Sequence, residues 1–578
     1  MPTKIIMLFT LTFVLLTGCK QPNDKHVNNK QQLNNTPKEL EQHSATFDKG
    51  VVKVTDNVYV AIGYGLANSI MIEGKTGLII VDTMESKQEA KIVLDEFRKI
   101  SNKPVKAIIY THNHADHVFG AATFAEAGDN VEIYGHESTQ HYINRVVNTL
   151  RPTIATRSMR MFGSHLDQHE LVNAGIGPFL GVDKDSILHS MTPTKTFKNQ
   201  LSVTIDGIDI QLVHAPGETE DQLFVWLPKQ KVLMPGDNLY KSFPNLYTIR
   251  GTYYRDVTKW ISSLDKMRRF EPEYVIPSHT RPIIGKVKIS EILTVYRDAI
   301  QFVHDQTIRY MNQGLTIENV VKAVQLPQHL ASHPYLQEFY GTVEWSVKSI
   351  FTGYMGWFDG NSTTLQPLPE LTRNKKMAKL AGGVDKLFQQ LEQAMTEKEY
   401  QWGLMVADML VGTDLEDNAK LIKAKILRKM AELESNPNAR HYYFTQAKEL
   451  ENKDFKPAIF VKPQPEFLEQ LPVASLFAAM PASLIAEDTL DVVLTVEFWI
   501  TDIEQTFTIQ IRNGIAEVQN YSLGTPDVKI ETSSQVWKEI ASKIRNPVSA
   551  IISGDLSVST GKLKLIEFLG YFDLPDLE

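Results

Sequence analysis

A short histidine-rich run constrains this chain more than any other part of its sequence. Residues 111–117 read Thr-His-Asn-His-Ala-Asp-His and directly follow an apolar segment, 105–110, that predicts a buried strand. Two neutral imidazoles two residues apart, His112 and His114, can reach one metal ion from a loop at the end of a strand. Asp116 and the histidine after it can reach a second ion, because the ions of hydrolytic two-metal sites lie about 3.5–4 Å apart. The run therefore predicts a metal centre at a strand end.

The composition limits which side chains can complete such a centre. Cys19 is the one cysteine among 578 residues, so no disulfide can form within the chain and no thiolate is available to a metal site. Any metal must therefore be held by histidine, aspartate and glutamate. The formal net charge of −8 provides no basic surface, which argues against nucleic acid as the main partner.

The first residues resemble an export signal. Residues 5–16 form an apolar run shorter than the about 20 residues needed to cross a bilayer, as is typical of a signal peptide. The sequence Leu-Thr-Gly-Cys that ends at Cys19 resembles a bacterial lipobox, whose cysteine is lipidated and becomes the new N-terminus. We therefore predict a signal peptide over residues 1–18 and an exported protein, lipid-anchored in the cell envelope on the periplasmic side. An ordinary secretory signal with a chance cysteine is the alternative.

Changes of pattern divide the remaining chain into four parts. Residues 19–50 are rich in Asn, Gln and Lys, which predicts a flexible tether behind the lipidated cysteine. Residues 51–290 mix strand-like and helical segments, which indicates a layered α/β domain. Residues 291–455 carry apolar residues three and four apart, as helices do. Residues 456–578 return to strand-like segments and predict a small α+β domain.

Turn signals place two hairpins in the α/β region. An Asp-Gly pair at 206–207 separates the strand-like segments 202–205 and 208–214, which suits a type I′ turn. A Gly-Lys-Thr-Gly sequence separates segments 69–73 and 78–82 in the same way. The central apolar runs do not alternate with polar residues, as is typical of strands that are buried on both faces.

The His-x-His-x-Asp-His run resembles the signature of the metallo-β-lactamase superfamily. That resemblance implies an αββα sandwich with the metal site at one edge and three more ligands near the ends of later strands. The candidates are Glu218 in Ala-Pro-Gly-Glu-Thr, Asp237 in Pro-Gly-Asp and His279 in Ile-Pro-Ser-His. The superfamily usually has histidine where Glu218 stands, and Glu220 is a rival ligand in the same segment.

The resemblance implies two zinc ions per chain. The expected ligands of the first ion are His112, His114 and Glu218, those of the second are Asp116, His117 and His279, and Asp237 lies between the two. Asp116 and Asp237 are also expected to take part in catalysis. Three carboxylates and a bridging hydroxide would offset the four positive charges of the ions. An anionic substrate would then need a separate cationic group.

Residues 243–251 supply a candidate for that group. They read Phe-Pro-Asn-Leu-Tyr-Thr-Ile-Arg-Gly and resemble the Asn-Leu-Tyr-x-x-Arg-Gly stretch of bacterial alkyl sulfatases. The resemblance implies that Asn245 and Arg250 bind the sulfate group, and the planar fork of arginine suits an oxyanion better than lysine does. Taken without the resemblance, Arg250 is typical of a surface salt-bridge residue.

The resemblance to alkyl sulfatases continues through the helical and C-terminal regions. Residues 304–307, 311–315 and 356–361 are similar to their dimerisation domain, which implies a homodimer, and the last region is similar to their sterol-carrier-like domain. The implied activity is zinc-dependent hydrolysis of alkyl sulfate esters of the dodecyl sulfate type to an alcohol and inorganic sulfate, by a hydroxide that two metal ions activate. The resemblance also favours the outer membrane as the place of the lipid anchor.

Two other functions stay open at this point. One is a different hydrolase of the same fold, a phosphodiesterase, lactonase or β-lactamase. The other is a lipoprotein that binds lipid without catalysis. The sequence also leaves open whether sulfur or carbon is attacked and which residue gives a proton to the leaving group, for which His165, His169 and Tyr247 are candidates. Residues 161–164 and 175–177 are predicted to form a flap over the site.

Overall fold

The computed structural model describes residues 36–147, 150–455, 468 and 471–573. The predicted signal peptide at 1–18 and the predicted lipid site at Cys19 lie outside this range. Within it, no helix combines the length and the apolar character that crossing a bilayer would require.

Two packed sheets form the α/β region, as the expected αββα fold requires. The first sheet has the order β1-β2-β3-β4-β5-β6-β7, with β4, β5, β6 and β7 parallel. Its strands are β1 (Gly50–Thr55), β2 (Val58–Ile62), β3 (Ser69–Glu73), β4 (Leu78–Val81), β5 (Val105–Ile109), β6 (Glu132–His136) and β7 (Lys195–Phe197). The second sheet has the order β13-β12-β11-β10-β9-β8. Its strands are β8 (Gln200–Ile205), β9 (Ile208–His214), β10 (Leu223–Leu227), β11 (Val232–Met234), β12 (Tyr274–Val275) and β13 (Ile283–Ile284).

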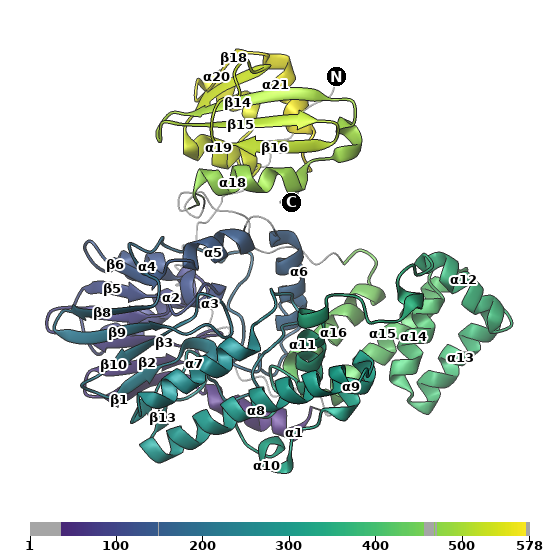
Figure 1. Cartoon of the computed structure of the whole chain (residues 1–578), viewed down its shortest axis with the longest axis horizontal. Coiled ribbons are helices and arrows are strands. Elements are labelled where there is room, and N and C mark those ends of the chain that lie inside the picture. The colour runs from purple at the N-terminus through teal and green to yellow at the C-terminus, as the bar shows by residue number, and fades with distance from the viewer. Residues whose placement is uncertain (1–35, 148–149, 456–467, 469–470, 574–578) are drawn as a thin grey trace, which may run out of the picture.

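Apolar side chains from both sheets fill one shared core, which includes Ile72 and Ile109 from the first sheet and Leu212 and Val225 from the second. Helices α2 (Lys87–Arg98) and α4 (Ala121–Ala125) cover the outer face of the first sheet. Helices α7 (Val257–Arg269) and α8 (Lys286–Asn312) cover the outer face of the second (Figure 1). These four layers confirm the predicted fold. Asp206 and Gly207 have φ angles of 47° and 83°, as a type I′ turn requires.

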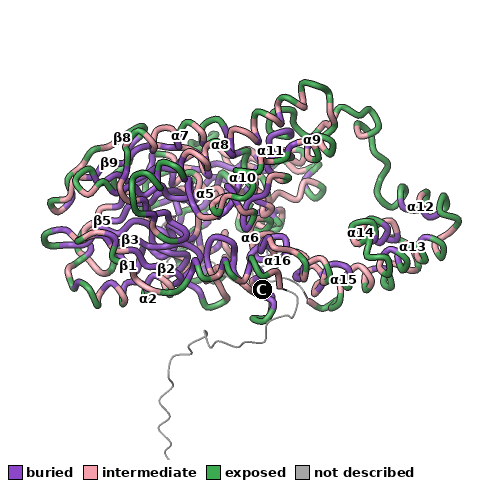
Figure 2. Tube along the Cα trace, turned by 90° about the horizontal axis from the view of Figure 1, so that it is seen from below, coloured by how far each residue is buried: buried purple, intermediate pink, exposed green. Residues whose placement is uncertain are grey.

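The helical region begins in contact with the second sheet. Helix α8 places Leu293 and Ile300 in one core with Trp260 of α7, so the change of pattern near residue 290 is a change of element type within a continuous core. Helices α9 (Ile317–Ala323), α10 (Gln328–Ala331) and α11 (Val343–Met355) follow. Helices α12 (Glu370–Leu380), α13 (Val384–Glu397), α14 (Tyr400–Met409) and α15 (Glu416–Leu433) share a core of their own and project from the rest (Figure 2). Helix α16 (Pro437–Glu451) returns to the α/β region.

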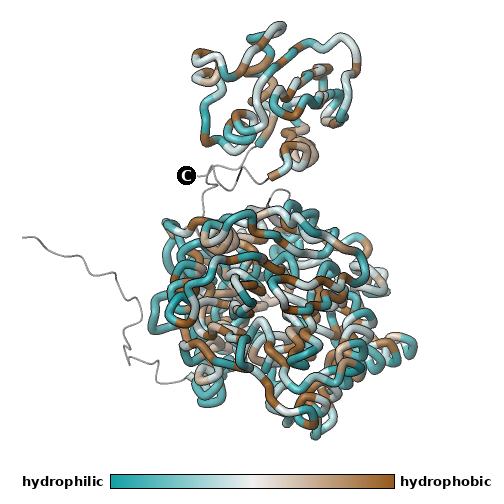
Figure 3. Tube along the Cα trace, turned by 90° about the vertical axis from the view of Figure 1, so that its left-hand side faces the viewer, coloured by the Kyte–Doolittle hydropathy of each residue, from teal (hydrophilic) through white to brown (hydrophobic). Residues whose placement is uncertain are grey.

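The C-terminal region is a separate α+β module, as Figure 3 shows. Its sheet has the order β16-β15-β14-β17-β18. The strands are β14 (Val493–Ile500), β15 (Gln505–Arg512), β16 (Ile515–Gln519), β17 (Val528–Thr532) and β18 (Leu556–Thr560). The helices are α18 (Val473–Ala479), α19 (Ser534–Ala541), α20 (Pro547–Ser553) and α21 (Lys562–Gly570), and the core is built around Phe477, Phe498 and Trp537.

The prediction of a flexible tether up to residue 50 is wrong for its last part. Helix α1 (Lys38–His43) and the 3-10 helix η1 (Ser44–Phe47) pack against the body of the protein. Leu40 and Phe47 are buried, and the Nε2 atom of His43 lies 2.7 Å from Gly175 O while its ring stacks on Phe339. These side chains are three or four residues apart and share one helical face, and burial of that face orders a segment that is otherwise polar.

Candidate active site

The predicted ligands converge at one edge of the sandwich. The histidine-rich run follows β5 and includes the short helix α3 (Ala115–Val118), while the second sheet contributes the residues that follow β9, β11 and β12. Three groups of ligand atoms each lie within 4.8 Å of one another: His112, His117 and Asp237; Asp116, His117 and His279; and His114, Glu218 and Asp237. All seven residues expected from the sequence are therefore in one cluster.

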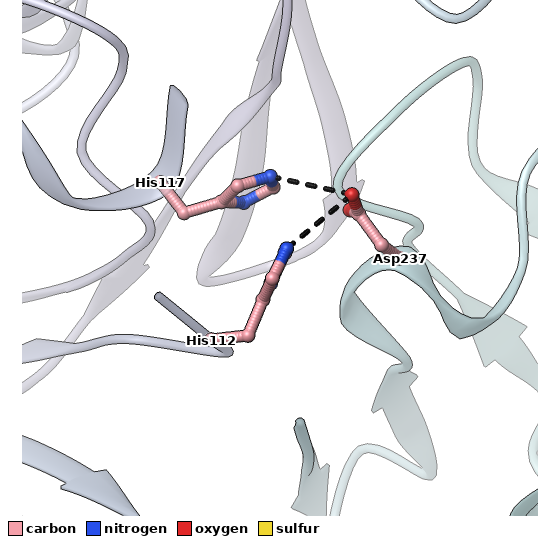
Figure 4. Close-up of side chains that lie close together, drawn as sticks. All are labelled: His112, His117 and Asp237. Carbon is pink, nitrogen blue, oxygen red and sulfur yellow. Dashed lines mark ion pairs between the residues drawn. The ribbon is translucent and has the colours of Figure 1, made fainter. Parts of the chain in front are cut away.

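Asp237 lies at the centre of this cluster, in the 3-10 helix η2 (Gly236–Asn238) after β11. Its Oδ2 atom is 3.5 Å from Nε2 of His112 and 3.5 Å from Nε2 of His117 (Figure 4). The same oxygen is 3.2 Å from Nε2 of His279. Asp116 Oδ2 is 3.3 Å from Nε2 of His117 and 3.5 Å from Nε2 of His279. Asp237 therefore lies in the central position expected of a bridging ligand.

A buried carboxylate that the sequence analysis missed, Asp82, orients this cluster. It follows β4 and has a φ of 60°. Its oxygens accept hydrogen bonds from the amide and hydroxyl of Thr111 at 2.9 Å each and from the hydroxyl of Ser278 at 2.7 Å, and Oδ2 lies 2.8 Å from Nδ1 of His117. Because His117 Nδ1 is held in this way, its Nε2 faces the cluster. The position directly after a buried strand was the one signal that could have identified Asp82.

Two other ligand histidines, His279 and His112, are fixed by the same principle. Nδ1 of His279 donates to Leu66 O over 2.9 Å, and Nδ1 of His112 lies 3.0 Å from Thr111 Oγ1. A proton on Nδ1 leaves the lone pair of Nε2 available to a metal.

Unpartnered atoms test whether the cluster fits a metal. Nε2 of His112, Nε2 of His117 and Oδ1 of Asp237 are buried and have no hydrogen-bond partner within the part of the chain that the structure describes. Unpaired buried acceptors are costly, and a cation would satisfy all of them at once. A set of imidazole nitrogens and carboxylate oxygens suits zinc and other divalent transition metals. The residues therefore fit the metal that the fold implies.

The electrostatics of the cluster divide its histidines into two pairs. Burial opposes charge on His117 and His279, but the Asp237 and Asp116 carboxylates raise the pKa of both. Burial lowers the pKa of His112 and His114 well below the usual histidine value, which keeps both rings neutral as metal ligands must be. Burial also opposes charge on Asp237, but the nearby rings of His279, His117 and His112 hold its pKa well below the usual value. The central carboxylate is therefore ionised.

The two candidate glutamates occupy different environments. Glu218 is buried with its carboxylate in the cluster beside His114 and Asp237. Glu220 is outside the cluster, and its carboxylate lies 2.8 Å from the ammonium group of Lys259. The structure thus favours Glu218 over Glu220 as the ligand.

Two arginines lie beside the cluster, and the sequence analysis found only the first. Nη2 of Arg250 is 3.3 Å from Nε2 of His114, and its Nη1 donates to Thr248 Oγ1 over 3.0 Å. Arg255 is buried, and its Nη1 is 3.0 Å from Oε1 of Glu218. Asn245, the other predicted sulfate-binding residue, is fully buried and is not among the residues that line the cavity beside the cluster, and neither polar atom of its amide has a hydrogen-bond partner among the described residues.

The cluster forms part of the lining of a cavity of about 460 Å³. Four of the seven ligands, His114, Asp116, Glu218 and Asp237, line the cavity together with Arg250. We call these five residues and the other three ligands, His112, His117 and His279, the cavity floor. The cavity walls are mostly apolar and come from α5 (Thr139–Val147), α6 (Arg151–Phe162) and loops of both sheets. Their members include Ile143, Ile154, Met159, Phe162, Ile176 and Leu180.

The predicted flap and proton donors have other surroundings. Residues 161 and 162 end α6, and Met161, Phe162 and Ile176 belong to a packed core with Tyr240 and Tyr340, so this segment is a packed part of the wall. His165, His169 and Tyr247 are not among the residues that line the cavity. The structure therefore does not place any of these three candidate proton donors at the cavity.

Comparison with known proteins places every part of this architecture in one family. Residues 62–279 match the metallo-beta-lactamase superfamily, residues 316–453 match the family described as alkyl sulfatase dimerisation, and residues 462–578 match the family described as alkyl sulfatase C-terminal. A linear primary-alkylsulfatase from Pseudomonas sp. is 34% identical over 523 residues, which cover 88% of this chain and 98% of the relative. An (R)-specific secondary-alkylsulfatase from Pseudomonas sp. is 25% identical, covering 91% of this chain and 81% of that one.

A solved structure shows the same fold. The stereoselective inverting sec-alkylsulfatase Pisa1 from Pseudomonas sp. matches with a TM-score of 0.87 at 23% identity, over 95% of this chain and 89% of that one. The sequence matches and the converging ligands lead to one conclusion: this chain belongs to the alkyl sulfatases of the metallo-β-lactamase superfamily, and it is a sulfuric ester hydrolase.

Proposed function

We propose that the protein hydrolyses alkyl sulfate esters of the dodecyl sulfate type. Two zinc ions held on the cavity floor would provide the catalytic metal centre. The observation that carries this proposal is the position of seven clustered histidine and acidic side chains on the floor of an apolar cavity, with Arg250 at their edge. An alkyl sulfate matches both parts of this cavity. Its compact sulfate anion suits the floor with Arg250, and its apolar chain suits the apolar walls.

The metal site would be formed by two groups of ligands with Asp237 between them. His112, His114 and Glu218 would hold one ion, and Asp116, His117 and His279 would hold the other. When bound, two zinc ions supply Lewis acidity, which lowers the pKa of water and makes a nucleophile available near neutral pH.

The protein's own side chains would bind and orient the ester. Arg250 can donate from its planar fork to sulfate oxygens, because its Nη2 lies at the edge of the ligand cluster. Asn245 has a buried amide without partners among the described residues, and a sulfate oxygen is an acceptor that such an amide can use. The apolar walls would bind the alkyl chain and exclude water from the floor.

Assembly and location are proposals of a different kind. The match of residues 316–453 to alkyl sulfatase dimerisation supports a homodimer, which light scattering of the purified protein would test. Export and lipidation at Cys19, with anchoring in the outer membrane, are supported by the sequence of residues 1–19 alone. Metabolic labelling with a fatty acid, which a Cys19→Ser protein should lose, would test them.

The experiment that tests the activity is sulfate release from dodecyl sulfate by a protein that begins at Thr36, with added zinc and with a chelator. This starting point keeps α1 and η1, which pack on the cavity wall. Zinc-dependent release supports the proposal. A protein that binds two zinc ions and releases no sulfate contradicts it, and phosphodiesters, lactones and β-lactams are then the substrates to test.

A further inference from the structure

Two connections join the candidate metal ligand Glu218 to the backbone of Asn245, one through an ion pair with Arg255 and one through hydrogen bonds of Tyr240. Nη1 of Arg255 lies 3.0 Å from Glu218 Oε1 and also donates to Asn245 O. The hydroxyl of Tyr240 donates to Glu218 Oε2 over 3.2 Å and accepts from Asn245 N over 2.8 Å. Both carboxylate oxygens and both backbone groups are therefore used in one closed ring of four residues.

The ring is buried, and the groups that close it are paired with one another, whereas Nε and Nη2 of Arg255 have no hydrogen-bond partner among the described residues. Tyr240 and Asn245 are fully buried, and Glu218 and Arg255 are 1% and 3% exposed. Nη1 of Arg255 is in an ion pair with Glu218 and donates a hydrogen bond to Asn245 O, and the hydroxyl of Tyr240 gives one hydrogen bond and receives one. Because an unpaired donor is costly in such surroundings, these four groups restrain one another's positions.

The same ring gives a physical reason for the glutamate at position 218, where the superfamily usually has histidine. A carboxylate offers a negative charge and two acceptor oxygens, one for Arg255 and one for Tyr240. An imidazole that binds a metal through one nitrogen presents only an N–H at the other. That N–H would face two donors, and the guanidinium of Arg255 would be buried without a counter-ion.

We propose that Arg255 and Tyr240 are positioning residues that fix the metal ligand Glu218 and the sulfate-binding Asn245 relative to each other. This inference rests on the proposed function, in which Glu218 binds a metal and Asn245 binds the sulfate group. Its consequence is that metal affinity and sulfate affinity are coupled. Breaking one connection of the ring weakens both affinities in parallel.

The first test uses Tyr240→Phe, which keeps the aromatic ring and removes the bridging hydroxyl. Zinc affinity is measured by competition with a chelator. Affinity for the sulfate end is measured by calorimetric binding of decyl sulfonate, whose carbon–sulfur bond is not a sulfate ester. Both should fall in parallel, within the roughly 10- to 100-fold range that is typical when an outer partner of a metal ligand is lost.

A matched control is Tyr134→Phe, which removes a tyrosine–glutamate hydrogen bond of 2.5 Å elsewhere in the same domain. Both affinities should stay at the wild-type values in this control. A Tyr240→Phe protein in which zinc affinity falls while sulfonate affinity stays unchanged, or the reverse, would overturn the proposed coupling.

The second test compares Glu218→His with the double variant Glu218→His, Arg255→Met. Removing the guanidinium removes the buried charge that has lost its partner, so the double variant should bind zinc more tightly than Glu218→His alone. A double variant that binds zinc no better than the single one overturns the explanation for Glu218. The Tyr240→Phe measurement still decides the coupling if either histidine variant fails to fold.

The wild-type protein separates this inference from the proposed function. A wild-type protein that binds no zinc and releases no sulfate refutes the proposed function itself. A wild-type protein that does both, with variants whose two affinities change independently, refutes only the positioning role of Arg255 and Tyr240.

Discussion

The floor of the cavity and its walls differ in how their side chains are held. On the floor, the ligand histidines are fixed by hydrogen bonds from the other side of the ring, as Asp82 fixes His117 and Leu66 O fixes His279. The walls are fixed by burial, because side chains such as Phe162 and Ile176 pack in an apolar cluster with Leu66. Hydrogen bonds are directional and apolar packing is not. The floor therefore has one geometry suited to chemistry, whereas the walls can change with little effect on it.

The largest effect should come from removing a ligand on the floor. Glu218→Gln should lower the amount of bound metal and reduce the rate of sulfate release by more than roughly 100-fold. Roughly 100-fold is the upper end of the loss that is typical when a hydrogen-bond partner behind a metal ligand is removed. Glu220→Gln is the matched control, because Glu220 is in the same segment and pairs with Lys259 outside the cluster. Metal content by mass spectrometry and kcat for dodecyl sulfate provide the readouts. Equal loss of metal in both variants would contradict the assignment of Glu218.

A smaller effect is expected when the hydrogen bonds behind a ligand are lost. Asp82→Asn replaces an acceptor beside His117 Nδ1 with an amide, and metal affinity should fall about 10- to 100-fold. Asp206→Asn is the comparison, since Asp206 also accepts three hydrogen bonds, from Thr76 and Gly77 in a turn. It should lower thermal stability and leave zinc affinity unchanged. Unchanged zinc affinity in Asp82→Asn would show that the floor does not depend on this carboxylate.

The walls should respond in substrate preference and not in chemistry. Ala155→Leu adds volume to the wall that α6 contributes, so KM for dodecyl sulfate should rise while kcat and metal content stay unchanged. Each methylene excluded from the cavity is worth about 0.8 kcal/mol, or roughly fourfold in affinity. Thr153→Leu, an exposed position on the same helix, is the control. A fall in kcat with unchanged KM would mean that this wall takes part in catalysis.

The smallest expected effect concerns a carboxyl group behind the wall. Glu85 Oε1 accepts from Leu66 N over 3.0 Å and from Gly181 N over 2.6 Å, and both segments border the cavity. Burial, together with the nearby Glu89 carboxylate, raises the pKa of Glu85 to about 8. The folded state therefore favours the neutral acid of Glu85. The stability that this preference contributes is fully present below the ordinary carboxyl pKa and is lost as pH rises through about 8.

Thermal unfolding at pH 6 and pH 9 would test this pH dependence. From pH 6 to pH 9 the melting temperature of the wild-type protein should fall by a few degrees more than that of the Glu85→Gln protein, whose residue 85 cannot ionise. The same fall in both proteins would contradict the role assigned to Glu85.

The floor could be predicted from the sequence because its residues are local to strand ends. The histidine-rich run directly follows β5, and Glu218, Asp237 and His279 each stand a few residues after a strand. Asp82 also follows a strand, but a single aspartate has no spacing pattern that would distinguish it from a turn residue. Arg255 was missed for a similar reason, because its role depends on a contact with Glu218 across 37 sequence positions.

The walls and the N-terminal segment could not be predicted, since they depend on contacts between distant parts of the chain. The cavity brings together α5, α6 and loops near residues 176–188 and 250–255, which share no periodic pattern. Residues 38–47 have a polar composition, and contacts with the distant residues Asn173, Gly175 and Phe339 order them. The layered fold, by contrast, follows from short-range patterns of strands and helices.

The most direct test of this division between floor and walls is the dependence of kcat/KM on alkyl chain length. Sulfate release would be measured for methyl, butyl, octyl and dodecyl sulfate with the zinc-loaded protein that begins at Thr36. We predict that kcat/KM rises by up to roughly fourfold for each added methylene until the cavity is filled. A value of kcat/KM that does not change from methyl to dodecyl sulfate would contradict the proposal that the apolar walls bind the chain.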